Sequence, residues 1–434
     1  MLEELAEKSV KHLKKYGNNF EVYIEEEESI ELNSEKSVLN FAKQENTIGI
    51  GFRVIKNSKT GFACTTDPEK IPETAEKAFA NCKSNEVDKD LSFAENQKYK
   101  KVEGIFDHRF QQGFDLDKAT DFINTVLNAV EDEKCESTST SFIASFNHNL
   151  ILNSNDLSVE NFVSGFAGDL AVNAYKNNEK STAYDSISSC MFDLDGEKLG
   201  EDVCKIAKNS ISGVKIDVDD IDVILDYSAA SGLLNPFISG FNGDNIRRSR
   251  SVLKGRRGYK IVSEDLSVYD DGTYPGGFNS SVSDGEGTSS QRTTLIKDGI
   301  LKNFIFDIYS ANKCGVESTG NGFREYSSTP MNSQSNVIFD FKDNIDISEI
   351  NKGLLVTDVL GAHTANPISG DFSVESNNSF LIEKGEITKP VKKAMITGNI
   401  FDGLSDCQGV KSDLKQKDSF IIPKILSKNL KVIG

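Results

Sequence analysis

Zinc chemistry needs histidine, cysteine or acidic ligands at close spacing, and the four histidines of this chain lie far apart. His12, His108, His148 and His363 fall in four separate segments. A helical zinc site has two histidines about one turn apart and a third ligand, and none of the four has such a neighbour. His363, in a glycine-rich loop, is better interpreted as a loop histidine bonded to backbone than as a catalytic group. The pattern leaves open a site whose ligands come together from distant segments.

The cysteines give no local site either. Cys64, Cys82, Cys135, Cys190, Cys204, Cys314 and Cys407 are scattered, odd in number and without a CxxC pair. We expect reduced, mostly buried thiols in a cytosolic protein. Cys314 follows Lys313, which favours a thiolate, but we expect it to be buried and inert. Asp406 beside Cys407 disfavours a thiolate there.

Charged residues gather in a few polar stretches. The basic run comprises Arg247, Arg248, Arg250, Lys254, Arg256 and Arg257. It suits an anion contact or an ion-paired interface, and equally a solvated face paired with the protein's own carboxylates. The net charge of −18 argues against a nucleic-acid partner, because phosphate binding needs a basic face. Acidic loops at 270–272 and 284–287 lack the spacing of calcium ligands and match ordinary Asp-Gly turns.

Alternating helical and strand patterns precede residue 217. Helical periodicity marks 2–16, 75–82, 119–130 and 199–211. Period-two alternation predicts half-buried strands at 20–25, 30–32 and 48–54, and further strands at 62–64, 138–152 and 157–174. A polar connection covers 83–112, and no internal repeat is evident. The acidic stretch 217–220 indicates a boundary, so we divide the chain into 1–219 and 220–434.

The second half is richer in loops. A strand at 221–225 precedes a helix over 228–241 that Pro236 is expected to break or bend. Residues 242–292 are dense in Gly, Asp, Ser and Arg, and so long a loop is usually functional. Hairpins are predicted across 297–299 and 383–386, with a short helix at 309–315.

Length and composition bound the class of protein. The 434 residues include 37% hydrophobic and 27% charged residues, which is ordinary for a globular protein. No apolar run approaches the roughly 18 residues of a membrane helix, and the first residues predict an amphipathic helix instead of a signal peptide. We therefore expect an α+β fold: an N-terminal half of helices layered on antiparallel strands, and a C-terminal β-rich half with long functional loops.

Several blocks of sequence resemble the TldD/PmbA family. They are IGIGFRVIKNSKTGFACTTD at 48–67, DDGTYPGG at 270–277, DGEGTSSQRTTLIKDGIL at 284–301 and ESTGNGFRE at 317–325, followed by SGDFS at 369–373, FLIEKGEI at 380–387 and ITGNIFDGL at 396–404. The similarity covers nearly the whole chain in the family's order. The resemblance implies that this chain belongs with zinc-dependent peptidases that act as two-subunit complexes.

The resemblance is closest to the PmbA (TldE-like) branch, which lacks the zinc motif. Zinc-carrying members have HExxxH just ahead of a Gly-Asp pair, and the landmarks Gly243-Asp244 place that motif on Leu234–Ser239, where neither histidine nor the glutamate is present. The third ligand in such members is a cysteine near the C-terminus, but the residues around Cys407 do not match. The resemblance therefore implies no catalytic residue, metal ligand or cofactor in this chain, and zinc in a TldD-like partner.

The same resemblance implies a role in holding substrate. The two subunits enclose a chamber that admits unfolded peptide, and strand addition would bind it with little demand on sequence. Our candidates for substrate contact are Asp271, Gly272, Arg292, His363, Gly370 and Asp371, in the loops 270–292 and 361–373.

Two other functions stay open on the sequence. One is a homodimeric peptide-binding or scaffolding protein that kept the fold without proteolysis. The other is a self-sufficient hydrolase with a spatially assembled site, for example His363 with cysteines or carboxylates. The missing HExxxH motif argues against the hydrolase, and dependence on a zinc-bearing partner separates the subunit role from the scaffolding protein. In each case the expected location is the cytoplasm, with no nucleic-acid or membrane partner.

Overall fold

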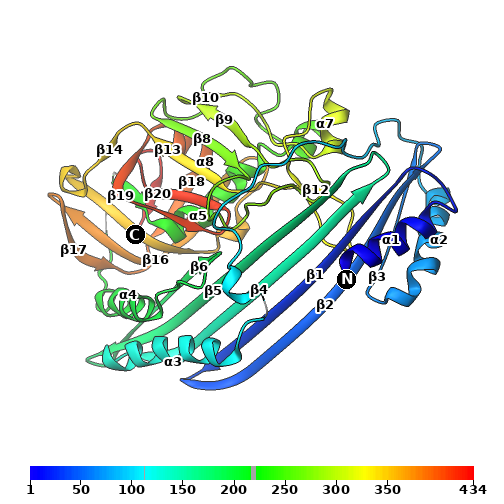
Figure 1. Ribbon diagram of the computed structural model, residues 1–434. Helices are drawn as coiled ribbons and strands as arrows, with labels where there is room; N and C mark the ends of the chain where they lie inside the picture. Colours follow the sequence, from blue (N-terminus) through cyan, green and yellow to red (C-terminus); the bar gives the residue numbers. More distant parts are fainter. Residues whose placement is uncertain (112, 217–220) are drawn as a thin grey trace.

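The computed structural model describes residues 1–111, 113–216 and 221–434, and within them the chain has two halves built on two large sheets (Figure 1). The first sheet has six strands and the second thirteen. The α+β class expected from the sequence is confirmed. The expected division between residues 219 and 220 lies outside the described residues.

The N-terminal sheet is antiparallel in the order β3-β2-β1-β4-β5-β6. Its strands are β1 (Phe20–Glu35), β2 (Val38–Lys56), β3 (Lys59–Thr65), β4 (Glu136–Asn153), β5 (Ser158–Lys176) and β6 (Glu179–Ser189). Its helices are α1 (Leu2–Leu13), α2 (Ile71–Asn81), α3 (Leu116–Asp132) and α4 (Gly196–Asn209). The chain thus runs twice through helix, three strands and helix, and the two units meet where β1 pairs with β4. This repeat of structure has no counterpart in sequence periodicity.

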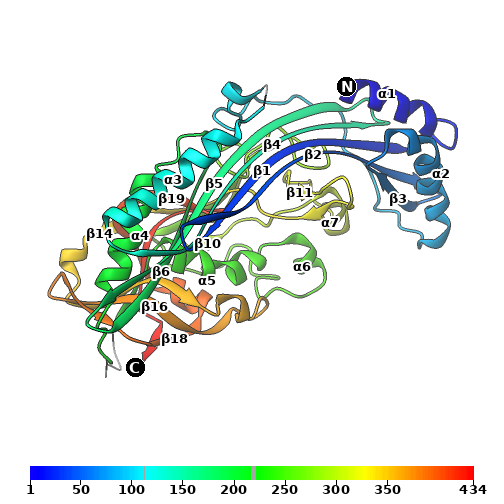
Figure 2. The same cartoon turned by 90° about the horizontal axis from the view of Figure 1, so that it is seen from below.

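The four helices of this half cover one face of the sheet, because alternate residues of the long strands are apolar. Phe20, Val22 and Ile24 of β1 pack with residues of α1 and α2. Further along the sheet, Leu32 and Phe142 pack with residues of α3 and α4. In Figure 2 the sheet lies between α3 on one side and the segments that carry α6 and α7 on the other.

The opposite face of this sheet is buried as well, against loops of the C-terminal half. Glu21 and Tyr23 of β1 have 0% and 3% of their surface exposed. Tyr23, Ile151 and Val159 pack there with Leu157 and Ile308. The prediction of a half-buried strand at 20–25 was therefore wrong, since its polar side faces another part of the protein and not solvent.

The C-terminal sheet follows the order β10-β9-β8-β13-β20-β7-β15-β16-β18-β21, and β14, β17 and β19 branch from it. The strands are β7 (Asp222–Leu225), β8 (Leu266–Asp271), β9 (Arg292–Lys297), β10 (Ile300–Leu301), β13 (Val337–Phe341), β14 (Asn344–Ile345), β15 (Lys352–Leu360), β16 (Asp371–Glu383), β17 (Glu386–Val391), β18 (Met395–Asn399), β19 (Cys407–Lys417), β20 (Phe420–Ser427) and β21 (Lys431–Ile433). A separate pair joins β11 (Gly322–Phe323) to β12 (Met331–Asn332). Both predicted hairpins, β9–β10 and β16–β17, are confirmed.

The described helices of this half are α5 (Tyr227–Ser239), α6 (Gly243–Arg247), α7 (Ile308–Cys314) and α8 (Ile400–Ser405). The side chain of Asp226 accepts a hydrogen bond from the Tyr227 N–H at the start of α5. Pro236 was expected to break or bend this helix, and it does not break it, because α5 continues through Pro236 to Ser239. The Asn235 side chain donates to the carbonyl of Ser231 one turn earlier, at 3.4 Å.

The long segment 242–292 is less irregular than expected, since it contains α6 and the fully buried strand β8. β8 was not predicted because it is short and ends in two aspartates, which leaves only Leu266 and Val268 as an alternating apolar pattern. Among the described residues, no helix combines the length and apolar character needed to cross a membrane.

Candidate functional site

A cavity of about 440 Å³ lies between the N-terminal sheet and loops of the C-terminal half. Its floor comes from β1, β4 and β5. The walls come from segments 278–285, 320–324 and 333–335, with Ser290 and Ser419. Most of the lining side chains are serines and asparagines, and the few aromatic ones are Tyr23, Phe278 and Phe323. Its volume falls within the range of sites that hold drug-sized ligands, about 300–1,000 Å³.

A chain of side-chain amides crosses the cavity floor. Asn161 donates to Asn149 at 2.9 Å, Asn149 donates to Asn147 at 3.2 Å, and Asn147 donates to Glu25 at 2.6 Å. The residues face the same side because Asn149 pairs with both Glu25 and Asn161 across the sheet.

Both ends of this amide chain are held by backbone of the C-terminal half. The Ser283 N–H donates to Asn161 at 2.9 Å, and the Tyr326 N–H donates to Glu25 at 3.1 Å. Burial raises the pKa of Glu25, although the bonds from Asn147 and Tyr326 oppose that rise. The floor is therefore a fixed polar surface whose orientation both halves determine.

Beside the floor, four charged residues join the two halves: Glu21, Glu286 and Arg324, which are buried, and Arg53, which is partly buried. Arg53 donates to both oxygens of Glu21, at 3.0 and 2.9 Å, and to Glu286 at 3.0 Å. Arg324 also donates to Glu21. Burial alone would raise the pKa of Glu21, but Arg53 and Arg324 hold it below its usual value. Burial raises the pKa of Glu286 in spite of Arg53.

The two arginines of this cluster are not equivalent. Arg324 is fully buried, and two of its nitrogens, Nε and Nη2, have no hydrogen-bond partner among the described residues. Its guanidinium lies 4.7 Å from the centre of the Tyr23 ring. Burial lowers the pKa of Arg324, whereas Glu21 and Glu286 raise that of Arg53 against the effect of burial. Arg53 is thus the better satisfied cation.

Three of the residues predicted to bind substrate lie together behind the cavity wall. Asp271 ends β8 and accepts two hydrogen bonds from Thr273, at 2.9 and 2.7 Å. Arg292 is 3.9 Å from Asp271 and 4.1 Å from the centre of the Tyr269 ring. Gly272 borders Ser290, which lines the cavity.

The other three form a second group at the same edge of the sheet. His363 is exposed in a short 3₁₀ turn, Ala362–Thr364. Gly370 has a positive φ of 84° and precedes Asp371, which accepts hydrogen bonds from Ser369 and Asn399 at 2.7 and 2.8 Å. Four strands lie between β8 and β16 in the sheet, a separation of roughly 24 Å. The structure therefore does not bring the two groups together.

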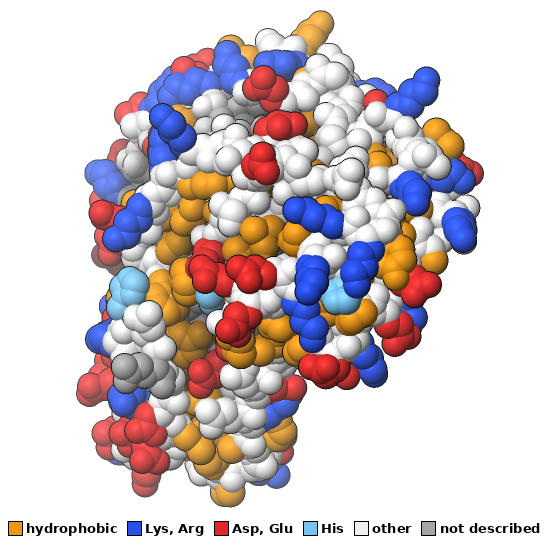
Figure 3. All heavy atoms as spheres, turned by 45° about the vertical axis from the view of Figure 1, so that its right-hand side comes forward, with side chains coloured by type: hydrophobic (Ala, Val, Ile, Leu, Met, Phe, Trp, Pro, Cys, Tyr) orange, Lys and Arg blue, Asp and Glu red, His pale blue; other side chains and the backbone are white. Residues whose placement is uncertain are grey.

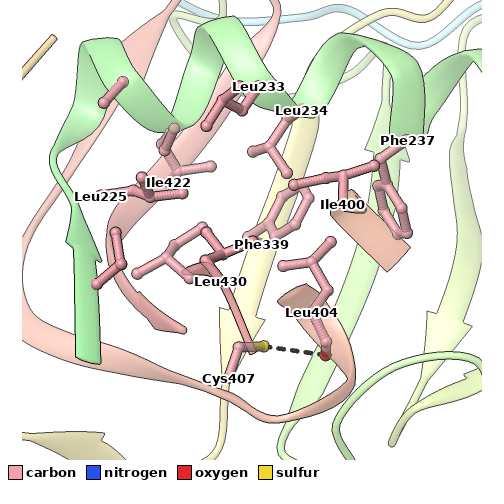
Figure 4. Packing of buried hydrophobic residues seen from close by; sticks show 14 of the residues in the cluster. Leu225, Leu233, Leu234, Phe237, Phe339, Ile400, Leu404, Cys407, Ile422 and Leu430 are labelled. Carbon is pink, nitrogen blue, oxygen red and sulfur yellow. Dashed lines mark hydrogen bonds between the residues drawn. The ribbon is translucent and has the colours of Figure 1, made fainter. Parts of the chain in front are cut away.

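Helix α5 carries apolar residues in the segment where the zinc-carrying members of the TldD/PmbA family have their HExxxH motif (Figure 4). Leu234, Phe237 and Ile238 are 1%, 0% and 3% exposed and pack into the largest apolar core. Leu404 of α8 lies in the same cluster, and Cys407 donates to its carbonyl oxygen at 3.3 Å. Burial raises the pKa of the Cys407 thiol to about 12. These side chains do not fit a zinc ion.

The remaining candidates from the sequence have ordinary surroundings. No group of three or more potential metal ligands occurs in residues 1–111, 113–216 and 221–434. Cys314 is exposed, so the expectation of burial was wrong, and desolvation raises its pKa. Arg247 and Arg248 pair with Asp244, at 2.5 and 2.7 Å. Acidic and basic side chains are interspersed over the face seen in Figure 3.

Sequence reasoning missed the amide floor and the buried charges. Asn147 and Asn149 stand two apart within a predicted strand, which is the spacing of one strand face. That spacing is the signal that could have identified them. Arg53, between apolar residues of β2, carries a weaker signal of the same kind.

Comparison with known proteins agrees with this architecture. The chain matches the PmbA/TldA metallopeptidase C-terminal domain over residues 219–434 and domain 1 of the same family over residues 20–82. An uncharacterized protein of Methanocaldococcus jannaschii is 33% identical over 88% of each chain. A metalloprotease TldD homolog of Buchnera aphidicola is 33% identical over 41% of this chain and 38% of that protein.

A solved structure is similar over the whole fold. The crystal structure of TldE from Thermococcus kodakarensis superposes with a TM-score of 0.92 at 26% identity, covering 99% of this chain and 100% of the other. The chain therefore belongs to the PmbA/TldD metallopeptidase family.

Proposed function

We propose that this protein is the non-metal subunit of a TldD/PmbA-type peptidase and depends on a zinc-bearing TldD-like subunit for cleavage of unfolded peptides. The observation that carries the proposal is the interior of α5. Leu234, the position of the first motif histidine, is a core residue there, and Ser239, the position of the second, is partly buried at the end of the helix. The first of two zinc-binding histidines would replace Leu234, whose side chain packs α5 into the apolar core.

The partner would supply the chemistry that this chain lacks. Zinc in such an enzyme polarises the carbonyl and activates water, and HExxxH members also carry a glutamate as general base. In this chain the corresponding positions are Leu234, Asn235 and Ser239. Its contribution is to close the shared chamber and to hold the peptide.

The loops 270–292 and 361–373 are our candidates for contact with the shared chamber. His363 and Asp371 are both exposed at one edge of the C-terminal sheet. The loop that carries Asp271, Gly272 and Arg292 ends at the same edge, with four strands lying between β8 and β16. A peptide or a partner surface would have to span that edge to touch both groups. We place the complex in the cytoplasm.

The test is zinc content and peptidase activity of the purified chain, alone and mixed with a zinc-bearing TldD-like partner. We expect no stoichiometric zinc and no cleavage of an unfolded peptide by the chain alone. Cleavage should appear in the mixture and disappear with a chelator. A matched sample of the partner alone shows how much of the activity depends on this chain.

Other results would support the alternatives. Stoichiometric zinc with chelator-sensitive cleavage by the chain alone would establish a self-sufficient hydrolase. A homodimer that binds peptide and gives no cleavage with the partner would establish a binding or scaffolding protein. Either result overturns the proposal, because both remove the dependence on a second subunit.

A further inference from the structure

The cavity floor has hydrogen-bonding capacity that the protein does not use. A side-chain amide has two N–H donors and an oxygen with two lone pairs. Asn147 donates one hydrogen bond to Glu25 and accepts one from Asn149. Asn149 donates one to Asn147 and accepts one from Asn161. Among the described contacts, each of these two asparagines therefore keeps one N–H and one lone pair.

The next amide along the floor differs in this respect. Asn161 donates to both Asn149 and Ser283, each at 2.9 Å, and accepts from the Ser283 N–H. It is 2% exposed, whereas Asn147 and Asn149 are only partly buried. Asn161 thus acts as a support, and the two asparagines of β4 are the ones that can meet a ligand.

The spacing of these two amides matches an extended peptide. Residues two apart on a strand project from the same face about 6.8 Å apart. An extended main chain presents an N–H and a C=O toward one side with the same two-residue repeat. A peptide lying along β4 could therefore pair successive N–H and C=O groups with Asn147 and then Asn149.

The rest of the cavity suits a main chain better than a particular side chain. Its walls include the small polar residues Ser280, Ser281, Ser290, Ser333, Ser335 and Asn279. The charged residues among those that line the cavity are Glu25, Asp284 and Arg324, so both signs of charge are present. Binding through main-chain groups supplies affinity with little dependence on sequence.

We infer that this cavity binds a short extended peptide by its main chain, with Asn147 and Asn149 as two donor–acceptor contacts. Glu25 and Asn161 are positioning residues, because each holds one end of the amide pair in a fixed orientation. The inference rests on the proposed function for the class of ligand, since an unfolded peptide is what the complex would take in.

A direct binding measurement on the full chain tests the inference without partner or metal. The probe is the blocked peptide acetyl-(Ala-Ser)₄-amide, titrated by calorimetry. A matched analogue has esters in place of its main-chain amides and so lacks the N–H donors at almost unchanged shape. We expect the amide peptide to bind and the ester analogue to bind at least about tenfold more weakly.

Two variants locate the binding. The double variant Asn147→Leu/Asn149→Leu should weaken binding of the amide peptide by about tenfold to a hundredfold. The control is Asn46→Leu, at an exposed position of β2 that does not line the cavity, and it should bind as the unchanged protein does. Circular dichroism and the thermal midpoint establish that each variant is folded.

The outcomes separate this inference from the proposed function. Equal binding of amide and ester peptides, or unchanged binding by a folded double variant, overturns the inference. If the double variant does not fold, the comparison of amide and ester peptides on the unchanged protein decides. Peptide binding without cleavage in any mixture would overturn the proposed function and leave the inference standing.

Discussion

Helix α5 and the cavity floor differ in the side chains that they present. The inner face of α5 presents Leu234 and Phe237, both almost completely buried in the apolar core. The cavity floor presents Glu25, Asn147 and Asn149, which are only partly buried. The inner face of α5 is filled by apolar packing, and the cavity floor carries polar groups with unused hydrogen-bonding capacity.

The difference separates side chains that stabilise the fold from side chains with hydrogen-bonding capacity left for a ligand. Apolar side chains that fill α5 stabilise the fold, because their burial removes hydrocarbon from water. Amides that keep unused donors and acceptors add little stability, since a satisfied hydrogen bond contributes only about 1 kcal/mol net. Substitutions in the first region should therefore change stability, and substitutions in the second should change binding.

The largest effect is expected for Phe237→Ala in α5. Phe237 is fully buried, with ring centres 5.1 Å from Phe241 and 5.2 Å from Phe401. Its truncation leaves a cavity, and such changes typically cost about 3–5 kcal/mol. Chemical unfolding should show this loss of stability, while the folded variant should bind the blocked peptide with unchanged affinity.

The matched control is Phe323→Ala, which makes the same change in the cavity wall. Phe323 is 54% exposed, so its truncation should alter the free energy of unfolding by less than about 1 kcal/mol. Equal losses of stability at the two positions would mean that the contrast between packed helix and open cavity is wrong.

The next largest effect is expected for Arg53→Met beside the cavity. Arg53 pairs with Glu21 and Glu286, which are 0% and 1% exposed. Removing one partner of a buried ion pair leaves an uncompensated charge and typically costs about 3 kcal/mol or more. Denaturant unfolding of the variant should show a loss of this size, and the two halves should separate at a lower denaturant concentration.

Arg324→Met is the comparison for that variant. Arg324 bonds to Glu21 and leaves two nitrogens without a partner, and Glu21 keeps both bonds from Arg53. The loss of Arg324 should therefore cost less than half as much as the loss of Arg53. A greater cost for Arg324→Met would show that its unpaired nitrogens have partners that contribute to stability.

The elements that could be predicted are those whose sequence pattern is consistent with only one local structure. Helices α3 and α4 and the hairpins β9–β10 and β16–β17 follow from apolar periodicity and turn residues. The face of β1 that carries Glu21 and Tyr23 does not. Alternation distinguishes two faces of a strand, but it does not distinguish water from a polar surface of the same protein.

The candidate site was less predictable because it is made by tertiary contacts. Asn149 and Asn161 are 12 residues apart, while Glu25 and Tyr326 are 301 apart. Nothing local indicates that the loop after β11 reaches β1, although Gly49 allows it, since a side chain there would collide with the Tyr326 ring. The proposed contacts at Asp271 and His363 stay predictions, at one edge of a sheet but not in one pocket.

The smallest effect concerns Asp270, which lies behind the cavity wall and should make stability depend on pH. Asp270 is 1% exposed and accepts from Asn321 and the Ser335 N–H, both at 2.7 Å. Burial raises its pKa to about 6 despite these bonds. Because the unfolded chain has the ordinary lower pKa, the folded protein binds a proton that the unfolded one releases, so stability rises as pH falls from about 6 to about 4. Asp270→Asn removes this gain, which amounts to about 2 kcal/mol.

Urea unfolding of both proteins at several pH values between 4 and 7 measures this gain. The difference between their free energies of unfolding should change by about 2 kcal/mol over this range. Parallel pH curves for the two proteins would show that Asp270 does not titrate in this range.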